Sequence, residues 1–589
     1  MSAYICDFET TNKNDESYVW LWGSMNLNNE NDWSYSTSIE SFFDFLMRSR
    51  TKKVYFHNLK FDSQFIIYFL LTHGFKWFDD RKDLTDFSFT AVIDEMGAIF
   101  SLTIQFNSKK NKVNIYDSLK LINFSVEKIP KKFGLDELNK KEMSYEGHEV
   151  GEVITNEEIT YLYHDLIIVQ KVLKMLMEQN LNKITIASCA LSSYKETIDF
   201  KFYFPVINEK DDMIMRKGYK GGYSFCAPEY QNKIINHRGV VLDVNSLYPS
   251  RMKKELLPYG EPVQFKGKYQ NNSIYPLYMQ VLSCEFELKK NRLPTLQIKG
   301  NIFYSEREYL TKSKGIETLC LTNIDLALFF DSYNVKNLTY NFGYMFKGKY
   351  GLFDKYIDYW TNVKITAKKN NQTGHYQIAK LMLNSLYGKF GTRLLRINKK
   401  PVLEDGIIKY KTSKEEMIKG IYLPMAAFIT SYARNYTIRS IEKVNKYGRE
   451  NYGYNLFLYA DTDSMHLLLD YDIIDNKIVL KDKNIYKILD IDPVRLGAWD
   501  IETAFTKAKY IRSKCYIELQ DNNKLNVHIA GMPQSMSKYV NFDNFKIGKN
   551  KLEFKKDSKA IKDKDKKLRY KRVKGGVSLV YTDFSLKSS

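Results

Sequence analysis

The fold of this chain is decided by the stretch Leu456-Phe457-Leu458-Tyr459-Ala460-Asp461-Thr462-Asp463-Ser464-Met465, in which apolar residues flank a short polar turn on both sides. This pattern predicts a β-hairpin with Asp461 and Asp463 at its tip. Acidic residues two apart on extended backbone share one face, so the two carboxylates can approach the same ligand.

A second acidic strand lies upstream, in Val240-Val241-Leu242-Asp243-Val244-Asn245-Ser246-Leu247-Tyr248-Pro249. Its apolar start predicts a buried strand that breaks at a turn and carries Asp243 near its end. Between the two acidic segments, Lys380-Leu381-Met382-Leu383-Asn384-Ser385-Leu386-Tyr387-Gly388 spaces Lys380, Asn384 and Tyr387 at i, i+4 and i+7. That spacing predicts one stripe of a helix, which Gly388 can close.

These residue types fit the transfer of a nucleotide to a primer end. Two Mg²⁺ ions held by Asp243 and Asp463 could activate a hydroxyl, while Lys380 neutralises charge on a triphosphate. Tyr248 and Tyr387 could wall the sugar and base, and a tyrosine under the sugar would clash with a 2′-hydroxyl. Core packing is the alternative explanation for either tyrosine, because the chain has 44 of them.

The N-terminal region holds a separate set of carboxylates. Asp7 and Glu9 lie two apart on a predicted strand, so both face the same side. Asp62 follows the strand that ends at Phe56, and Tyr161 and Asp165 lie one turn apart on a helix that Thr155 and Glu158 start with a capping box. Four carboxylates can hold two divalent ions for phosphodiester hydrolysis, and the phenol of Tyr161 could orient the attacking water.

Composition narrows the class of partner. The net charge of +20 favours a polyanion, since basic grooves gain affinity by releasing counterions from phosphates. No apolar run approaches the roughly 18 residues of a membrane-spanning helix, and the N-terminus has no signal-peptide pattern. The six cysteines form no CxxC pair, so we expect no zinc site and no disulfides. We therefore expect a soluble, intracellular protein without a membrane partner.

Taken in order, these motifs resemble those of family B DNA polymerases. The sequences DxE, NxxxD and YxxxD resemble the proofreading exonuclease motifs, which implies Asp7, Glu9, Asp62 and Asp165 as metal ligands. DxxSLYP, KxxxNSLYG and YxDTDS resemble polymerase motifs A, B and C. Three further motifs resemble the family's YxGG, TxxAR and KxY sequences, and they lie at Tyr219–Gly222, Thr430–Arg434 and Lys514–Tyr516.

The resemblance is greatest to the small protein-primed phage polymerases of the phage phi-twenty-nine type, and it covers nearly the whole chain. It implies an α/β and α+β multidomain fold, with an RNase H-like 3′→5′ exonuclease domain followed by a palm, fingers and thumb polymerase domain with two palm insertions. It also implies a replicative enzyme that starts synthesis on a terminal protein, displaces the non-template strand and is highly processive. We expect two Mg²⁺ ions per active site, which Mn²⁺ may replace.

Site residues follow from the same resemblance. The catalytic set is Asp243, Asp461, Asp463, Asp7, Glu9, Asp62, Tyr161 and Asp165, with all but Asp461 and Tyr161 as metal ligands. The nucleotide-binding set is Tyr248, Lys364, Lys380, Asn384 and Tyr387. The DNA-binding set is Tyr55, Asn58, Phe61, Ser118, Leu119, Tyr219, Gly221, Gly222, Ser246, Arg434, Lys514 and Tyr516.

The implied domain order has seven parts. They are the exonuclease (1–182), palm with motif A (183–253), insertion one (254–352), fingers with motif B (353–391), insertion two (392–422), palm with motif C and KxY (423–533) and thumb (534–589). The expected partners are primer-template DNA, single-stranded DNA, deoxynucleoside triphosphates and a terminal protein that forms a heterodimer with the polymerase. The expected location is the cytoplasm of an infected bacterial host.

Two departures from the family pattern stand out. The exonuclease lysine has no clear counterpart, because counting back from Asp165 reaches Asn139, with Lys140 and Lys141 next to it. The segment from Lys364 to Lys380 is longer than expected, which predicts an extended loop at the tip of the fingers. The alternative function is an ordinary primer-dependent repair or plasmid polymerase of family B. A basic nucleic-acid-binding protein would explain the charge but not the acidic motifs.

Overall fold

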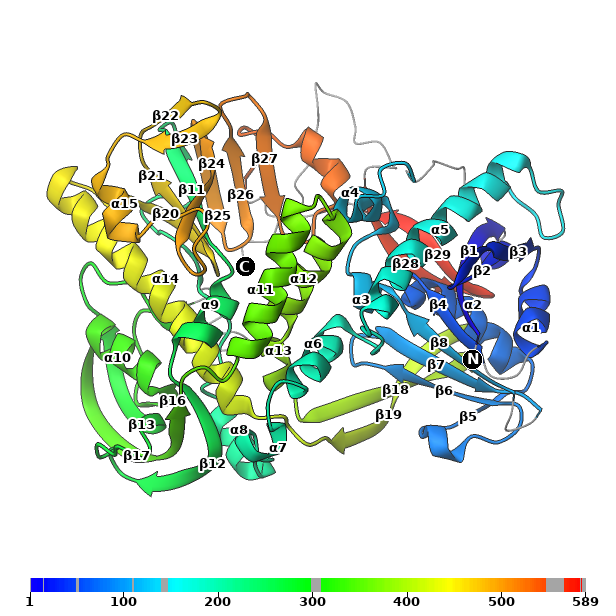
Figure 1. Cartoon of the computed structure of the whole chain (residues 1–589), viewed down its shortest axis with the longest axis horizontal. Coiled ribbons are helices and arrows are strands. Elements are labelled where there is room, and N and C mark those ends of the chain that lie inside the picture. The colour runs from blue at the N-terminus through cyan, green and yellow to red at the C-terminus, as the bar shows by residue number, and fades with distance from the viewer. Residues whose placement is uncertain are drawn as a thin grey trace.

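The computed structural model describes residues 2–13, 15–48, 52–107, 111–138, 147–297, 309–546, 566–582 and 584. Its N-terminal domain is built on an eight-stranded sheet with the order β3-β2-β1-β4-β8-β7-β6-β5 (Figure 1). The strands are β1 (Ala3–Lys13), β2 (Glu16–Asn26), β3 (Asn29–Ser36), β4 (Lys52–Phe56), β5 (Lys76–Trp77), β6 (Ser88–Ile93), β7 (Ile99–Gln105) and β8 (Lys112–Asp117). β4 pairs in parallel with both β1 and β8, so the ends of these three strands meet at one edge.

Helices cover both faces of this sheet. On one face, α5 (Asn156–Glu178) packs across β1 and β2 so closely that a Cβ at Gly23 would lie 2.8 Å from the side chains of Leu162 and Leu166. The predicted capping box is confirmed, since Thr155 and Glu158 satisfy each other's backbone N–H groups. On the other face lie α1 (Ile39–Met47) and α2 (Leu59–Thr72). Because strand side chains alternate, Ile5 packs toward α5 while Phe8 packs into the opposite core.

The second half of the chain is centred on a five-stranded sheet with the order β24-β11-β21-β20-β9. Its strands are β9 (Ser224–Cys226), β11 (Gly239–Val244), β20 (Phe457–Asp461), β21 (Ser464–Leu468) and β24 (Trp499–Phe505). The predicted hairpin of motif C is confirmed as β20 and β21, with Thr462 at φ 65° in its turn. Next to it stands a second sheet, formed by β10 (Ile234–Ile235), β25 (Lys507–Arg512), β26 (Cys515–Leu519) and β27 (Leu525–Ile529).

A four-stranded antiparallel sheet occupies most of residues 254–352. It has the order β12-β17-β13-β16 and consists of β12 (Leu257–Lys266), β13 (Leu277–Leu288), β16 (Glu317–Thr322) and β17 (Tyr333–Lys349). Helix α10 (Asn323–Ser332) joins β16 to β17 and packs against the 29-residue helix α14 (Leu423–Asn451). Insertion one is therefore seated directly on the longest helix of the palm.

The predicted extended loop at the tip of the fingers is wrong. Helix α11 (Asp354–Lys369) continues to within three residues of α12 (Thr373–Ser385), so the additional residues lengthen the helices and only 370–372 form the turn. The predicted single helix through Tyr387 is also wrong, because α12 ends at Ser385 and α13 (Tyr387–Phe390) begins after one bend residue. Gly388 lies inside α13 and closes no helix. Figure 1 places α11 and α12 between the N-terminal domain and the palm.

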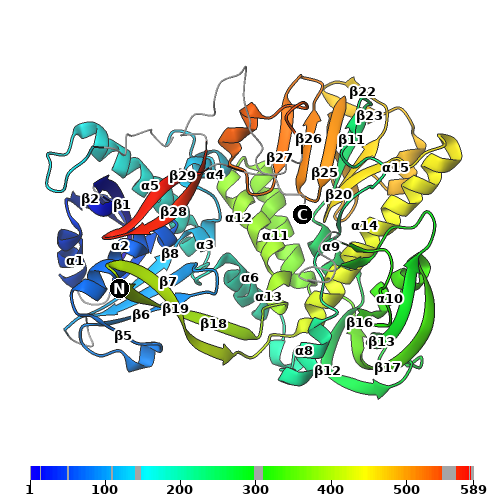
Figure 2. The same cartoon turned by 180° about the vertical axis from the view of Figure 1, so that it is seen from behind.

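Two β-hairpins link the polymerase half to the N-terminal domain (Figure 2). The first consists of β18 (Leu395–Glu404) and β19 (Ile407–Met417), and the second of β28 (Lys567–Val573) and β29 (Gly576–Thr582). Tyr410 donates a hydrogen bond of 3.1 Å to Gln64 of α2, and Arg572 lies 4.7 Å from the centroid of the Tyr410 ring. The backbone N–H of Ser17 donates to Lys574 at 2.9 Å. The two hairpins therefore touch each other and the N-terminal domain.

All six cysteines are free and buried. Within the described ranges, no helix combines the length and apolar content that a bilayer-crossing segment requires. Lys546 to Lys574 is rich in Lys and Arg, and most of this stretch, residues 547–565, lies outside the described part of the chain.

Candidate active sites

The first carboxylate centre lies where β1 meets α5. One ligand oxygen from each of Asp7, Glu9 and Asp165 lies within 4.8 Å of the other two. Glu9 and Asp165 are buried, as is Tyr161 one turn before Asp165. Asp62 on α2 is also buried, and this burial, followed by the charge of Asp7, raises its pKa well above the ordinary value. A buried group of neighbouring carboxylates of this kind fits divalent cations, which prefer carboxylate oxygens.

The start of α2 is held by a carboxylate that the sequence analysis missed. Asn58 adopts a left-handed conformation at φ 73°, immediately before the helix. Asp117, at the end of β8, accepts hydrogen bonds from the backbone N–H groups of Asn58 at 3.0 Å, Leu59 at 3.3 Å and Leu119 at 3.0 Å. Asp117 thereby fixes the turn that leads to Asp62. Its signal in the sequence was an acidic residue at the end of a parallel strand.

The residues expected to contact single-stranded DNA surround this turn. Tyr55 and Ser118 are buried, and the hydroxyl of Ser118 lies 3.0 Å from His57 Nδ1. Asn58 donates a hydrogen bond of 3.1 Å to the hydroxyl of Tyr570, which lies on β28. The ring of Phe61 is 6.0 Å from the same tyrosine. Tyr570 was not singled out in the sequence, and the DNA contacts of the whole group stay predictions.

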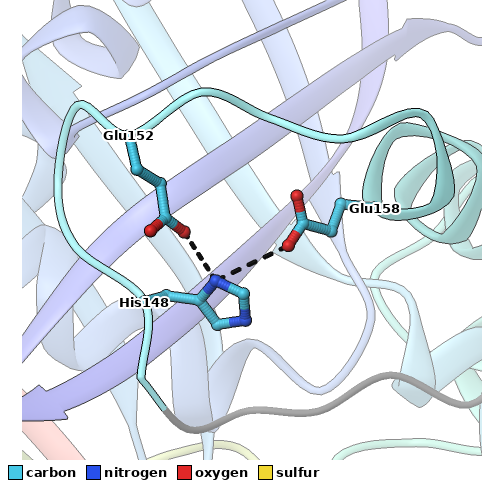
Figure 3. A group of neighbouring side chains, drawn as sticks. All are labelled: His148, Glu152 and Glu158. Atoms are coloured by element: carbon cyan, nitrogen blue, oxygen red, sulfur yellow. Dashed lines mark hydrogen bonds and ion pairs between the residues drawn. The ribbon is translucent and has the colours of Figure 1, made fainter.

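A His/Glu cluster precedes α5 (Figure 3). Nδ1 of His148 lies 2.5 Å from Glu152 and 3.6 Å from Glu158, and its ring stacks on Trp20 with 3.9 Å between centroids. Glu158 also accepts the backbone N–H of Thr155 at 2.8 Å. These contacts fasten the loop before α5 onto β2. Residues 139–141, where the exonuclease lysine was sought, lie outside the described residues.

The second carboxylate centre lies at the end of the five-stranded sheet. Asp243 stands opposite Ser464 on β21, and the backbone N–H of Val244 donates to the carbonyl of Asp463 at 2.8 Å. Burial first, and then the charges of Asp463 and Glu502, raise the pKa of Asp243 to about 8. Burial also raises the pKa of Asp463, and the charges of Asp461 and Glu502 raise it further. This excess of negative charge again fits divalent cations.

Two acidic residues of this centre were missed in the sequence. Asp500 stands opposite Asp243 on β24, and Glu502 follows two residues later. Both act on the pKa of Asp243 through space. Their Asp-x-Glu spacing repeats that of Asp7 and Glu9, so the pattern was present in the sequence but stood alone without a flanking motif.

The fingers bring cations and rings to the same centre. Lys380 is close enough to Asp243 and Asp463 to lower the pKa of each. Burial, then Lys380 and then Lys368 lower the pKa of Lys364, as expected for a buried cation beside other cations. The rings of Tyr248 on α9 (Leu247–Lys254) and Tyr387 stack with 4.0 Å between centroids. Asn384 is exposed near the end of α12.

The YxGG segment packs against several parts of the polymerase half. A Cβ at Gly222 would lie 2.6 Å from the side chain of Thr462, whereas Gly221 has open space around it. Arg434 is buried and donates to the carbonyls of Lys220 and Gly221, both at 2.7 Å. The sequence resemblance assigned Arg434 to DNA, but its guanidinium is occupied inside the protein, so a direct contact with DNA stays a prediction.

Three more of the expected DNA-binding residues lie around the same centre. Tyr219 packs against Gly391, where a Cβ would lie 2.6 Å from the tyrosine hydroxyl. Ser246 caps α9 in a left-handed conformation at φ 57°. Lys514 is exposed in the turn between β25 and β26, and its backbone N–H donates to the hydroxyl of Tyr459 at 2.8 Å. Tyr516 follows on β26, with its ring 5.1 Å from that of Tyr459.

Comparisons with known proteins agree with this geometry. The family model described as DNA polymerase type B, organellar and viral, matches residues 44–478. The DNA polymerase of Bacillus phage phi29 is 37% identical over 609 residues, with 99% of each chain covered, and that of Streptococcus phage Cp-1 is 32% identical over 616 residues, with 100% of this chain and 99% of the relative covered. A solved structure of phi29 DNA polymerase with primer-template DNA and incoming nucleotide superposes with a TM-score of 0.87 at 36% identity over the full length of both chains.

The full-length superposition confirms the predicted fold class, an exonuclease domain joined to a polymerase domain. The carboxylates of motifs A and C, which the sequence placed more than 200 residues apart, meet in one centre of that fold. The chain belongs to the family B DNA polymerases of phages, of the phi29 type, and is a DNA-replicating polymerase.

Proposed function

We propose that this polymerase also proofreads with a 3′→5′ exonuclease, starts synthesis on a protein primer and displaces the non-template strand without a helicase. The observation that carries the proposal is the presence of two separate carboxylate centres in one chain, one at Asp7, Glu9 and Asp165 and the other around Asp243 and Asp463. The proposed site of action is the cytoplasm of the bacterial host of a phage.

At the polymerase centre, Asp243 and Asp463 would hold two divalent ions, with Mg²⁺ the expected species and Mn²⁺ a possible substitute. When bound, such ions lower the pKa of the attacking 3′-hydroxyl and stabilise charge on the leaving phosphate. Lys364 and Lys380 would hold the triphosphate, because these neighbouring cations gain most from an anion between them. The stacked ring of Tyr248 would exclude a ribose 2′-hydroxyl.

At the exonuclease centre, Asp7, Glu9, Asp62 and Asp165 would hold the ions, and the phenol of Tyr161 would orient the attacking water. The strand end would lie over Asn58, Phe61, Ser118 and Leu119. A solved phi29 DNA polymerase complexed with single-stranded DNA, superposing with a TM-score of 0.87, supports this class of ligand. Transfer of a strand end between the two centres would make proofreading possible within one complex.

Strand displacement is supported by the two hairpins. The β18–β19 hairpin and the β28–β29 hairpin contact each other and the N-terminal domain, which would let protein surround duplex DNA. Protein priming is supported by the resemblance of the sequence motifs to the protein-primed polymerases and by the extra sheet in residues 254–352, which is seated on α14. A terminal protein would offer a Ser, Thr or Tyr hydroxyl as the first acceptor of a nucleotide.

Primer extension on a primed single-stranded circle tests the proposal. With Mg²⁺ and four deoxynucleotides, the wild type is expected to make products many times the length of the circle, and Asp463→Asn to make none. Products no longer than one circle would favour the alternative, an ordinary primer-dependent repair or plasmid polymerase.

A second experiment tests whether synthesis and degradation take place at separate centres. Asp7→Ala combined with Glu9→Ala is expected to abolish degradation of single-stranded DNA and to leave primer extension intact. Loss of both activities would mean that the two centres do not work separately. Protein priming would be refuted if the enzyme, mixed with candidate terminal proteins of its phage and labelled deoxynucleotides, yielded no nucleotide–protein adduct.

A further inference from the structure

A buried polar cluster lies behind the polymerase centre. Oε1 of Glu518 accepts hydrogen bonds from His466 Nδ1 and from the hydroxyl of Tyr510, each at 2.6 Å. The three residues are all at most 2% exposed. The other carboxylate oxygen of Glu518 accepts a long contact of 3.4 Å from Asn526. Burying a carboxylate is costly unless it is hydrogen-bonded, so this cluster depends on all three members.

The cluster joins the two sheets of the palm. His466 lies on β21, three residues after Asp463, whereas Tyr510 and Glu518 lie on β25 and β26 of the neighbouring sheet. Its hydrogen bonds therefore run directly between the strand of motif C and the hairpin that carries Lys514 and the KxY tyrosine.

Rings extend the cluster to Tyr516. The Tyr516 ring lies 5.0 Å from that of His466 in an edge-to-face arrangement, and 5.7 Å from that of Tyr510. On its other side it stacks on His528 at 5.1 Å. Tyr459, two residues before Asp461, stacks on Tyr510 at 5.6 Å. Of the rings that contact Tyr516, His466 and Tyr510 are members of the cluster, and Tyr459 packs against both of them.

The backbone of the same hairpin is also connected to the cluster. Lys514 adopts a left-handed conformation at φ 56°, which directs its N–H to the Tyr459 hydroxyl at 2.8 Å. The position of Lys514 therefore depends on Tyr459, whose ring lies 5.1 Å from His466 and is stacked on Tyr510.

We propose that His466, Glu518 and Tyr510 form a positioning cluster that fixes the KxY hairpin against motif C and so sets where the primer end lies relative to Asp461 and Asp463. This inference rests on the proposed DNA-binding role of Lys514 and Tyr516. The three residues touch no substrate. They act through the ring of Tyr516 and the backbone of Lys514, and so they affect primer placement and not triphosphate binding.

Two conservative variants test the cluster in the full-length enzyme. Glu518→Gln keeps the shape and removes the charge, and Tyr510→Phe keeps the ring and removes one donor. Each is expected to raise the KM for primer-template about tenfold or more, the lower end for loss of a hydrogen bond to a charged group. The KM for deoxynucleotide and the rate of single-strand degradation should stay within about twofold, the change expected for groups outside both sites.

Tyr471→Phe is the matched control. Tyr471 is as buried as Tyr510 and lies in the same core, but its hydroxyl bonds to Asp521 and to the Phe505 carbonyl, away from the hairpin. It is expected to leave the KM for primer-template unchanged. If all three variants lowered the melting temperature and the rate of both activities together, with no change in that KM, the cluster would be structural only.

Combination with Tyr516→Ala separates the inference from the proposed function. Because Glu518 acts partly through Tyr516 and partly through the backbone of Lys514, Glu518→Gln should add a smaller rise in KM once the Tyr516 ring is gone; fully additive effects would refute the positioning role. If Tyr516→Ala alone leaves the KM for primer-template unchanged, the proposed primer role of KxY fails. If Tyr516→Ala raises it and Glu518→Gln does not, only the positioning cluster fails.

Discussion

Substitution of Asp325 by alanine is expected to destabilise the protein at the junction of insertion one and the palm. Asp325 lies on α10 and pairs with the buried guanidinium of Arg434 at 2.5 Å. Arg434 also donates to the carbonyls of Lys220 and Gly221 at 2.7 Å and to the hydroxyl of Ser431 at 3.0 Å. Removing one partner of a buried ion pair costs about 3–5 kcal/mol when the remaining charge is left alone.

The three remaining acceptors reduce that cost. We expect Asp325→Ala to lower the free energy of unfolding by about 2–3 kcal/mol. The neutral hydrogen bonds that Arg434 keeps offset less than half of the energy that the buried charge pair contributes. For a cooperative unit of about 150–250 residues, such a change lowers the melting midpoint by roughly 5–10 °C. Differential scanning calorimetry measures this shift, and Asp325→Asn should recover part of it through its amide oxygen.

A surface pair on the same helix provides the control. Asp331 pairs with Arg439, and their side chains are 49% and 32% exposed. Exposed pairs contribute about 0–1 kcal/mol, so Asp331→Ala should shift the midpoint by less than about 4 °C. If Asp325→Ala shifted the midpoint no more than this control, the buried bridge would not hold insertion one to the palm.

Three further outcomes are expected. Gly222→Ala should cut primer extension at least about tenfold while sparing degradation, because its Cβ would lie 2.6 Å from Thr462 beside motif C and the turn would have to shift; equal loss of both activities in the two assays would contradict this. In metal-free enzyme, Asp243 with its pKa raised to about 8 holds a proton that the unfolded chain releases, so stability should fall by about 1–2 kcal/mol as the pH rises toward 8, and calorimetry should find that Asp243→Asn or saturating Mg²⁺ removes this slope. Tyr248→Val should raise ribonucleotide incorporation by an order of magnitude or more, roughly the discrimination of a steric wall, since the ring stacked on Tyr387 would no longer fill the space beneath the sugar; unchanged selectivity in single-nucleotide extension would refute that role.

Short periodic patterns predicted the local structure of both centres well. The strand of Asp7, the capped helix of Asp165 and the hairpin of Asp461 each occur where the sequence placed them. Each depends on residues within one element, where alternation, capping and turn chemistry act over a few positions. Rules that act within one helix or hairpin were therefore enough to predict these three elements.

The features that the sequence did not predict have a different physical origin. Asp117 and Glu502 each have a local signal, an acidic residue at a strand end and an Asp-x-Glu pair, but sheet pairing brings their strands to the sites, so the local signal alone did not link them to a site. The fingers turn was misjudged because Lys368-Lys369-Asn370-Asn371 resembles a polar loop, yet packing of α11 against α12 extends the helix to Lys369. For Arg434, the resemblance implied a contact with DNA, which stays a prediction, and the sequence did not indicate its buried ion pair with Asp325.

These contacts converge on the short segment from Tyr219 to Tyr223. Tyr219 packs against Gly391 at the end of the fingers, the carbonyl of Gly221 accepts from Arg434, and the carbonyl of Tyr223 accepts the N–H of Thr462 in motif C at 2.6 Å. Fingers, α14 and the catalytic hairpin therefore share one stretch of backbone that also leads to the N-terminal domain. Because a packed backbone cannot adjust to one neighbour without displacing the others, movement of this segment would alter the balance between synthesis and degradation before it abolished either.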